Sequence, residues 1–452
     1  MQFGLIGEHL GHSFSREIHG RLSSDPYELG ELRPDEIEGF LRRRDFRGVN
    51  VTIPYKQAVI PYLDELGESA RGAGAVNTIV NREGKLYGYN TDYYGFISMT
   101  KHAGADFGGA RVVILGAGGA AKAVRAAALA MGASDVVNAV RTVRAPGQLP
   151  IGDPSTFDGC NILVNATPVG MYPRWQEAPV RLEELLPRMD LRAVLDCIYN
   201  PLSTPLVIDA ISGRAVPTGT MAARGLVNGR VPRSGRDERS EVPVGTALPE
   251  IAPVVSAGGL YMLVAQAVKA RELFVGESIP DEVTQREYER LLRTKRNIVL
   301  CGMPSCGKST IGKALAEATG RRFEDSDSVV ELQAGMTIPE IFSREGEEGF
   351  RIRETAALES LAPEQGLVIA TGGGMPLRPQ NLRLMHHNGI ICFLRRDLPL
   401  LRPGGGRPLS SSRSALEHLY EHRLPLYMAA ADVVIDNNGP ISETLSKLLE
   451  LC

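Results

Sequence analysis

Two apolar runs, each followed by a glycine-rich turn, dominate the pattern of hydrophobic and polar positions along the chain. The first run, Arg111–Leu115, predicts a buried strand, and the alanine-rich stretch beyond its turn predicts a helix to about Met131. The second run, Asn297–Cys301, precedes a glycine turn and the helix-prone segment Ile311–Thr319. Strand, turn and helix in this order are the units of an α/β fold with parallel strands. The pattern therefore predicts two α/β modules on one chain.

Weaker patterns lie around these two runs. Phe3–Ile6 and Asp135–Val140 predict further strands. Asp281–Arg293 has helical spacing but few apolar positions, which predicts a solvated connecting helix and a domain boundary at 277–295. The segment 218–253 is rich in Gly, Arg, Ser and Pro with little periodicity, which predicts a long or mobile loop.

Length and composition exclude several classes of protein. A chain of 452 residues is too long for one ordinary core, so two or three domains are expected. A net charge of -3 gives no electrostatic footprint for nucleic acid. No apolar run approaches the ~18–20 residues of a membrane span, and no leader-like N-terminal segment is present. The six cysteines include no C-x-x-C pair, which indicates a reducing compartment and no structural zinc. We expect a soluble cytoplasmic protein with no nucleic-acid or membrane partner.

The second glycine turn, Gly302–Thr310, matches the phosphate-binding pattern G-x-x-x-x-G-K-[ST] in its required context of strand, loop and helix. Its glycines let successive backbone N–H groups turn towards a polyphosphate, and the helix N-terminus adds partial positive charge. Lys308 is expected to reach the β- and γ-phosphates, and the Ser309 hydroxyl to hold Mg²⁺. The residues expected to bind ATP or GTP here are Pro304, Ser305, Cys306, Gly307, Lys308, Ser309 and Thr310.

The first glycine turn predicts a dinucleotide site. Its loop residues are Gly116, Ala117, Gly118, Gly119 and Ala120. An NAD-preferring fold usually places an acidic residue about 20 positions beyond such a loop, at the end of the second strand. This chain has Arg141 and Thr142 there, with Arg144 close behind. A guanidinium makes bidentate bonds to a phosphate, so NADP(H) is predicted rather than NAD(H).

Four polar clusters occur in the first hundred residues. They are His12-Ser13-Phe14-Ser15, Asn50-Val51-Thr52-Ile53-Pro54-Tyr55-Lys56, Gly74-Ala75-Val76-Asn77-Thr78 and Asn90-Thr91-Asp92. Hydroxyls, amides, one lysine and one aspartate are the groups that a small polyhydroxylated carboxylic acid needs for binding. Taken singly, each cluster also fits a helix cap or an Asx-turn.

Together these clusters resemble shikimate dehydrogenase, and the resemblance covers essentially all of 1–276. The further matching motifs are Gly116–Gly119, Val164–Met171, Asp196-x-x-Tyr199-x-Pro201-x-x-Thr204 and Gly259–Gln266. The resemblance implies substrate binding by Ser13, Ser15, Thr52, Lys56, Asn77, Asp92, Tyr199 and Gln266. It implies a catalytic pair of Lys56 and Asp92, and a cofactor site that also includes Met171 and Gly259. Two departures concern the cofactor half: Val140 replaces the family's usual asparagine, and 218–253 looks like an insertion.

From Arg296 onward the chain resembles shikimate kinase. The matching motifs are Phe323–Asp327, Gly335–Phe342, Gly346–Glu354, Ala370–Gly374, Arg407–Leu409 and Arg423–Tyr427. The resemblance implies shikimate binding by Asp327, Arg351, Gly372, Gly373, Gly374 and Arg423, a lid carrying Arg407, and help from Asp325 with Mg²⁺. The residue types agree, because arginine matches a carboxylate and Asp327 can accept a hydroxyl proton. The glycine-rich span Arg402–Arg407 is shorter than the family's lid.

The two resemblances support one prediction, since the product of the first reaction is the substrate of the second. We expect a bifunctional enzyme that reduces 3-dehydroshikimate with NADPH and phosphorylates shikimate with ATP and Mg²⁺. The expected domains are a substrate domain at 1–98, completed by a helix near 258–275, a Rossmann domain at 99–257 and a P-loop α/β kinase domain at 296–452.

Two alternatives stay open at this point. One is a quinate-type dehydrogenase joined to the kinase. The other is a regulator that binds these metabolites without catalysis, although Lys56, Asp92, Lys308 and Asp327 are all present. The sequence also leaves the oligomeric state open, a homo-oligomer included.

Overall fold

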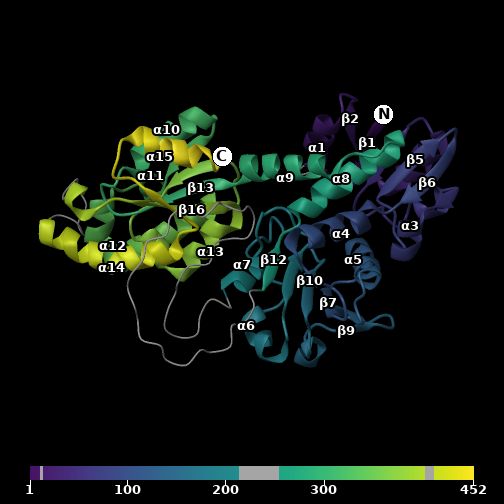
Figure 1. The fold of residues 1–452 in the computed structure, drawn as a ribbon, viewed down its shortest axis with the longest axis horizontal. Coiled ribbons are helices and arrows are strands. Elements are labelled where there is room, and N and C mark those ends of the chain that lie inside the picture. Colours follow the sequence, from purple (N-terminus) through teal and green to yellow (C-terminus); the bar gives the residue numbers. More distant parts are fainter. Residues whose placement is uncertain (11–13, 213–253, 403–411) are drawn as a thin grey trace. The chain divides into compact units, whose positions relative to one another are not determined.

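The computed structural model describes residues 1–10, 14–212, 254–402 and 412–452 (Figure 1). The chain divides into two compact units, which are described separately. Unit 1 comprises Met1–Ala210 and Val255–Leu292, and unit 2 includes Arg293–Cys452. The predicted loop at 218–253 lies outside the described residues.

Unit 1 contains two six-stranded sheets, and the first is mixed, in the order β2-β1-β3-β5-β6-β4. Its strands are β1 (Phe3–Gly7), β2 (Tyr27–Glu31), β3 (Gly48–Val51), β4 (Glu65–Leu66), β5 (Thr78–Arg82) and β6 (Lys85–Tyr89). Its helices are α1 (Ser15–Leu22), α2 (Ile37–Arg43) and α3 (Glu68–Ala73). Strands β1, β2 and β3 run parallel, whereas β5 and β6 form an antiparallel hairpin beside β3. Because β3 and β5 are neighbours in the sheet, the polar segments that flank them meet at one edge.

The second sheet of unit 1 is parallel throughout, in the order β12-β11-β10-β7-β8-β9. Its strands are β7 (Arg111–Leu115), β8 (Asp135–Val140), β9 (Gln148–Pro150), β10 (Ile162–Asn165), β11 (Ala193–Asp196) and β12 (Val255–Ala257). The associated helices are α5 (Gly119–Ala130), α6 (Leu182–Leu185) and α7 (Pro205–Ser212). Chain order reverses on either side of β7, and ligands of open α/β sheets bind beside such a switch point. The predicted strands 111–115 and 135–140 are confirmed.

Three longer helices complete unit 1: α4 (Thr91–Ala103), α8 (Leu260–Val275) and α9 (Asp281–Lys295). Helices α4 and α8 lie side by side (Figure 1). Their backbones approach closely at Gly95, where a Cβ atom would lie 2.6 Å from the Met262 carbonyl oxygen. The expectation that α9 is surrounded by solvent is wrong, because its Tyr288 and Leu291 are buried against unit 1.

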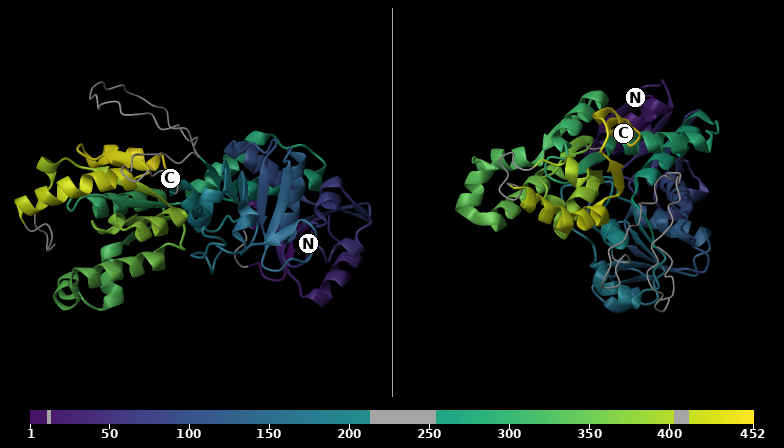
Figure 2. Two further views of the ribbon diagram at one scale, coloured as in Figure 1. Left: turned by 90° about the horizontal axis from the view of Figure 1, so that it is seen from below. Right: turned by 60° about the vertical axis from the view of Figure 1, so that its left-hand side comes forward.

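Unit 2 is a five-stranded parallel sheet in the order β14-β15-β13-β16-β17. Its strands are β13 (Asn297–Cys301), β14 (Arg322–Asp325), β15 (Leu367–Ala370), β16 (Gly389–Arg395) and β17 (Val433–Asp436). Its helices are α10 (Lys308–Thr319), α11 (Ser326–Ala334), α12 (Ile338–Leu361), α13 (Pro379–Asn388), α14 (Arg413–Ala430) and α15 (Ile441–Leu449). Helices α10 and α15 cover one face and α13 and α14 the other (Figures 1 and 2).

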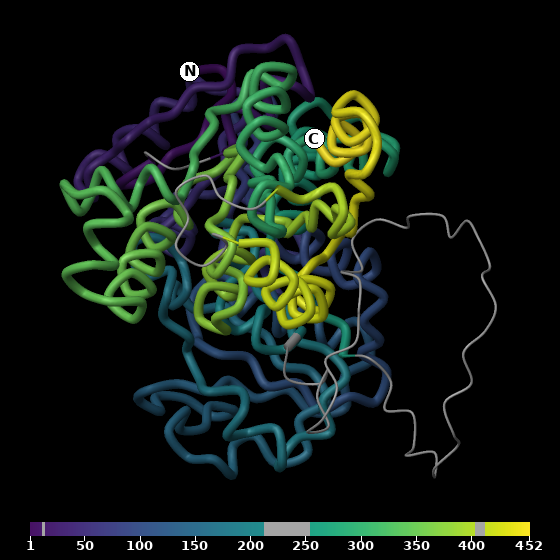
Figure 3. Tube along the Cα trace, turned by 90° about the vertical axis from the view of Figure 1, so that its left-hand side faces the viewer, coloured from purple at the N-terminus to yellow at the C-terminus, as the bar shows by residue number. Residues whose placement is uncertain are grey.

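The three central strands of unit 2, β13, β15 and β16, are largely apolar because both faces of the sheet are covered there. Leu300, Ile369 and Ile391, from three neighbouring strands, are each 3 % exposed or less. The Cα trace in Figure 3 follows this unit from green to the yellow C-terminal helices. The predicted strand 297–301 is confirmed, and the helix after it begins earlier than its apolar pattern suggested, at Lys308. Within the described residues, no helix is long and apolar enough to cross a membrane.

Candidate active sites

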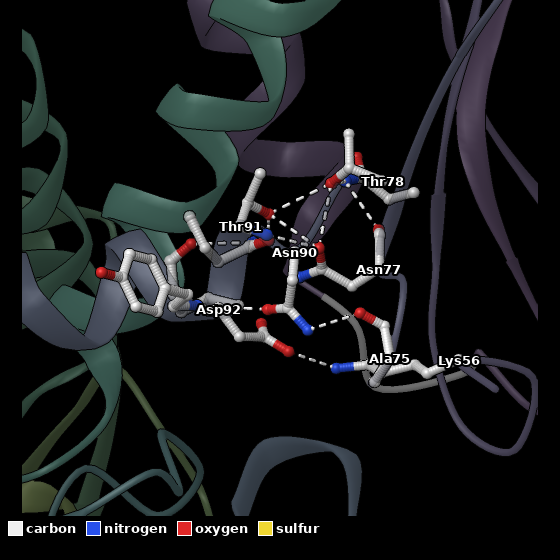
Figure 4. Close-up of polar contacts among 11 residues, drawn as sticks. Lys56, Ala75, Asn77, Thr78, Asn90, Thr91 and Asp92 are labelled. Atoms are coloured by element: carbon white, nitrogen blue, oxygen red, sulfur yellow. Dashed lines mark hydrogen bonds and ion pairs between the residues drawn. The ribbon is translucent and has the colours of Figure 1, made fainter. Parts of the chain in front are cut away.

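Lys56 and Asp92 form an ion pair at the edge of the first sheet. Lys56 Nζ lies 2.6 Å from Asp92 Oδ2, and the two side chains are 18 % and 11 % exposed (Figure 4). Asp92 lies in the first turn of α4, which Asn90 caps by accepting a hydrogen bond from the Tyr93 amide at 3.2 Å. The Asn90 side-chain amide in turn donates to the Ala75 carbonyl at 2.9 Å, which ties the cap to the loop before β5. The start of α4, which carries Asp92, is therefore fixed beside Lys56.

A network of neutral polar groups surrounds Asn77, beside this pair (Figure 4). Asn77 Oδ1 accepts from the Thr91 amide at 2.6 Å and from the Thr78 hydroxyl at 3.1 Å. The Thr91 hydroxyl lies 3.2 Å from Gln266 Oε1 on α8. Segments far apart in the sequence thus meet here, because Thr91 contacts both Asn77 and Gln266.

Three more of the predicted substrate residues lie in the described part of unit 1. Thr52 follows β3, and its amide donates to the Ile6 carbonyl at 2.9 Å. Ser15 is the first residue of α1 and is 8 % exposed. The preceding ring, Phe14, packs 5.3 Å from Tyr199, whose pKa is raised by burial. Ser13 lies outside the described residues.

The predicted dinucleotide loop lies beside Lys56. Helix α5 begins at Gly119, and its N-cap Gly118 provides no side-chain cap, so the first amides of the helix are not bonded by a capping side chain. Gly116 adopts φ 99°, the left-handed region that favours glycine. A Cβ atom on Gly119 would lie 3.4 Å from Lys56 Cδ. A ligand phosphate or ring bound along this loop would lie beside Lys56, which fits a dinucleotide.

The other predicted cofactor residues belong to three further segments of unit 1. Arg141, Thr142 and Arg144 follow β8 and are exposed. Met171 is 39 % exposed, directly after the sharp turn at Gly170. Gly259 caps α8, and a side chain there would collide with the Cys197 carbonyl, so this glycine is required for packing.

A buried carboxylate, Asp196, organises the turn that leads to Tyr199. It accepts from Asn165 Nδ2 at 2.9 Å, from the Thr204 hydroxyl at 2.7 Å and from the Ile198 amide at 2.9 Å. Burial raises its pKa to about 7, although these three hydrogen bonds favour the ionised form. Asp196 is the first residue of the motif that ends in Thr204. The hydrogen bonds of Asp196 thus hold the two ends of this motif together.

In unit 2, the phosphate loop has the backbone conformation that its glycines permit. Gly302 and Gly307 adopt φ 148° and 97°, and α10 begins at Lys308 without a side-chain cap. Lys308 Nζ donates to the carbonyls of Gly302 at 3.0 Å and Met303 at 3.1 Å. The loop amides and the lysine therefore gather at one helix N-terminus, the arrangement that binds a polyphosphate.

Ser309 and Asp325 form a pair of oxygen donors next to this loop. The Ser309 hydroxyl donates to Asp325 Oδ2 at 2.6 Å. Asp325 caps α11, where its Oδ1 accepts from the Asp327 amide at 3.1 Å. A hydroxyl and a carboxylate are the ligands that Mg²⁺ prefers, so these residues fit the predicted metal site.

The phosphate loop borders a cavity of about 610 Å³. Besides the loop, its lining includes all the predicted acceptor residues, namely Asp327, Arg351, Gly372, Gly373, Gly374 and Arg423. The glycines leave room for charged side chains. A Cβ atom on Gly372 would lie 2.6 Å from Asp327 Oδ1, and one on Gly373 3.0 Å from Arg423 Nη1. Asp327 and Arg423 therefore pack directly against the backbone of Gly372 and Gly373, where a larger residue would leave no room for them.

Comparison with known proteins decides the family. A model of the shikimate dehydrogenase substrate binding domain matches residues 5–79, and a model of shikimate kinase matches 304–452. A shikimate dehydrogenase (NADP(+)) of Halothermothrix orenii is 41 % identical over 247 residues, covering 48 % of this chain and 83 % of that protein. The chain belongs to the shikimate dehydrogenase family. Its C-terminal part is a shikimate kinase domain.

Solved structures agree. Shikimate dehydrogenase 1 of Peptoclostridium difficile has a TM-score of 0.51 and 32 % identity, covering 64 % of this chain and 98 % of its own. A chorismate mutase/shikimate 5-dehydrogenase fusion protein of Clostridium acetobutylicum has a TM-score of 0.51 and 30 % identity, covering 64 % and 96 %. The predicted α/β fold class and the two enzyme classes, dehydrogenase and kinase, are confirmed. The chain is a bifunctional enzyme of the shikimate pathway.

Glu354, which lines the kinase cavity, and Tyr427, which bonds to the cavity residue Gly373, were not predicted as site residues. Glu354, 1 % exposed, accepts from Arg351 Nη1 at 2.6 Å, and burial raises its pKa despite that guanidinium. The hydroxyl of Tyr427, which is buried, donates to the Gly373 carbonyl. The spacing of Arg351 and Glu354, three apart on a helix, was a usable signal for the first. Arg407 lies outside the described residues.

A second cavity of about 470 Å³ adjoins the phosphate loop of the kinase domain. Its lining is Ser305, Arg396, Pro399, Leu400 and Arg402. Apolar side chains together with two guanidinium groups suit a nucleoside more than a second phosphate group, because an aromatic base packs on apolar and guanidinium planes. Two cavities thus adjoin the phosphate loop.

Proposed function

We propose that the chain reduces 3-dehydroshikimate to shikimate with NADPH and then transfers a phosphoryl group from ATP to shikimate, giving shikimate 3-phosphate. The observation that carries the first step is the Lys56–Asp92 pair, which lies between the polar network of Asn77 and the glycine at the start of α5. The observation that supports the second is the cavity that joins the phosphate loop to Arg351 and Arg423.

NADPH, when bound along Gly116–Gly119, supplies the hydride. Reduction of a ketone develops negative charge on its oxygen, so a proton donor must lie beside it. Lys56 would donate that proton from Nζ, and Asp92 would orient the ammonium group while accepting a hydrogen bond from a ring hydroxyl. Asn77 and Gln266 lie in hydrogen-bonding reach of the same network and would bind further hydroxyls.

The preference for NADPH would come from the end of β8. Arg141 and Arg144 are exposed there and would bind the 2′-phosphate of the cofactor. The similarity to the shikimate dehydrogenase (NADP(+)) of Halothermothrix orenii supports this choice.

In the kinase domain, Arg351 and Arg423 would bind the carboxylate of shikimate, and Asp327 would receive the proton of the attacking hydroxyl. Ser309 and Asp325 would hold Mg²⁺, which neutralises phosphate charge when it is bound. Lys308 would exchange its bonds to the loop carbonyls for bonds to the phosphates. Arg407 would add a further positive charge from the lid.

The proposal is tested on the intact chain by two separate assays. Oxidation of NADPH by 3-dehydroshikimate is followed by absorbance, and phosphorylation of shikimate by mass spectrometry of the product. Quinate, tested as an alternative substrate in the oxidative direction, should be turned over much more slowly than shikimate. Faster turnover of quinate, or no phosphorylation of shikimate, would contradict the corresponding half of the proposal.

A further inference from the structure

Helix α9, which joins the two enzyme units in sequence, is packed into the dehydrogenase. Leu291 is fully buried and Tyr288 is 6 % exposed. Both belong to one apolar cluster with Ile18 of α1 and with Leu260 and Val264 of α8. A helix with few apolar residues therefore still buries a complete face, because each of those residues lies on the same side.

Tyr288 also joins an aromatic group that includes α4. Its ring centroid lies 5.1 Å from that of His102 on α4 and 5.1 Å from that of Tyr261 on α8. His102 and Tyr261 are themselves stacked at 4.0 Å. Helix α9 thus contacts the three helices that carry predicted substrate residues: α1 with Ser15, α4 with Asp92 and α8 with Gln266.

The contact with α1 is specific as well as apolar. Arg290 Nη1 lies 2.9 Å from Glu17 Oε1, and Arg290 Nε lies 2.9 Å from Glu287 Oε2. The exposed fractions of the side chains are 23 % for Arg290, 6 % for Glu287 and 36 % for Glu17, so the guanidinium is partly shielded from solvent and Glu17 is at the edge of that shielding. Shielded, hydrogen-bonded ion pairs restrict geometry more than exposed ones do.

Glu17 lies in the first turn of α1, two residues after Ser15, and the N-cap residue Phe14 makes no side-chain cap hydrogen bond. A helix end without a cap frays readily unless a tertiary contact holds it. The Arg290–Glu17 pair is such a contact, and it acts on the turn that carries Ser15.

We propose that Arg290 is a positioning residue of the dehydrogenase site, which fixes Ser15 against the substrate acid by holding Glu17. This inference rests on the proposed function for the identity of the substrate. Because Ser15 would bind the acid equally well before and during hydride transfer, the loss of its position should weaken substrate binding without slowing the chemical step.

The test uses the full-length chain with Arg290→Gln. The KM for 3-dehydroshikimate should rise at least about fivefold while kcat stays within about twofold. The KM for NADPH and the rate of shikimate phosphorylation should not change, which shows that unit 1 is folded and that unit 2 is unaffected. Arg290→Lys, which keeps the charge, should recover part of the loss. Arg286→Gln, an exposed position on the same helix, is the matched control.

A readout independent of activity separates this inference from the proposed function. Amide hydrogen exchange across α1 should become faster in Arg290→Gln and remain unchanged across α5. A KM for 3-dehydroshikimate that stays within twofold, a KM for NADPH that rises equally, or unchanged exchange in α1 would each overturn the inference. If the unaltered chain did not reduce 3-dehydroshikimate at all, the proposed function would fail, and the exchange measurement would still decide the role of Arg290.

Discussion

The two sites differ sharply in charge, although both are expected to bind the same kind of acid. In the dehydrogenase, one ion pair, Lys56–Asp92, lies among neutral amides and hydroxyls. In the kinase, Arg351, Arg423 and Lys308 line one cavity together with Asp327 and Glu354. Hydride transfer creates a single negative charge on one oxygen, whereas phosphoryl transfer brings a polyphosphate next to a carboxylate. The comparison teaches that the charge of the reaction, more than that of the substrate, determines the charge of the site.

The lysines of the two sites also differ in their hydrogen-bond partners. Lys56 already contacts its partner Asp92, whereas Lys308 bonds to the carbonyls of its own loop. Under the proposed mechanism Lys56 would keep its present partner, whereas Lys308 would exchange the loop carbonyls for phosphate oxygens.

The largest effect is expected when Lys56 is replaced in the dehydrogenase site. Lys56→Met should lower the dehydrogenase rate by about 10³-fold, since a positioned proton donor contributes about 10²–10⁴-fold. NADPH binding, measured by nucleotide fluorescence, and kinase activity of the same chain should persist. Retained turnover in stopped-flow absorbance would remove Lys56 from the proposed role.

Changing the metal ligand should have the next largest effect, and only on the kinase. Asp325→Asn removes the negative charge of the carboxylate that accepts a hydrogen bond from the Ser309 hydroxyl. We expect the kinase rate to fall about 10²-fold and the Mg²⁺ concentration for half-maximal rate to rise. An unchanged dependence on Mg²⁺ would place the metal elsewhere.

Two carboxylates that pair with Arg351 allow the effect of burial to be measured within the kinase site, because they differ mainly in exposure. Arg351 donates to Glu354, whose side chain is 1 % exposed, and to Glu347, whose side chain is 54 % exposed. Glu354→Gln should raise the kinase KM for shikimate about tenfold, because the arginine loses its buried counter-charge. Glu347→Gln should change it less than about twofold, since exposed pairs contribute little. Equal effects would show that burial is not the deciding factor.

A smaller effect is expected at the cofactor. Arg141→Ala and Arg144→Ala should each raise the KM for NADPH about fivefold and leave the weak rate with NADH nearly unchanged. The ratio of the two cofactors' kcat/KM values measures the loss of discrimination directly. An equal change with both cofactors would mean that these arginines do not contact the 2′-phosphate.

The smallest effect concerns pH and stability. The pKa of Asp196 is about 7 in the folded protein, above the ordinary value of 3.8, so the folded form binds more protons between these values. Asp196 should therefore make unit 1 less stable as pH rises from about 4 to 7, and Asp196→Asn should remove that part of the slope. Urea unfolding followed by the fluorescence of the single tryptophan, Trp175 in unit 1, measures it. An equal slope in both proteins would contradict the raised pKa.

Much of the fold could be predicted from local pattern. The strands 111–115, 135–140 and 297–301 end where the sequence predicted, because continuous apolar runs between polar residues and glycines define buried parallel strands. The burial of helix α9 was not predicted, because Tyr288 and Leu291 pack against partners in α1 and α8. Helix α1 lies more than 250 residues earlier in the sequence, so no local pattern reveals this contact.

The candidate sites show the same limit. The positions of Lys56 and Lys308 followed from motifs, since each motif includes its own local geometry. The role of Arg290 could not be predicted, because its partner Glu17 belongs to another helix and no motif links the two. Likewise, the motif alone does not reveal the structural role of Asp196, which depends on its three hydrogen-bond donors.

The central claim is that one polypeptide holds two independent sites acting on successive forms of one acid. The most direct measurement supplies the intact chain with 3-dehydroshikimate, NADPH and Mg·ATP, and quantifies shikimate and shikimate 3-phosphate by mass spectrometry. Both products should form; Lys56→Met should abolish both, and Lys308→Met should abolish only the second, with shikimate accumulating. Formation of neither product by the unaltered chain, or loss of shikimate formation in Lys308→Met, would contradict the account.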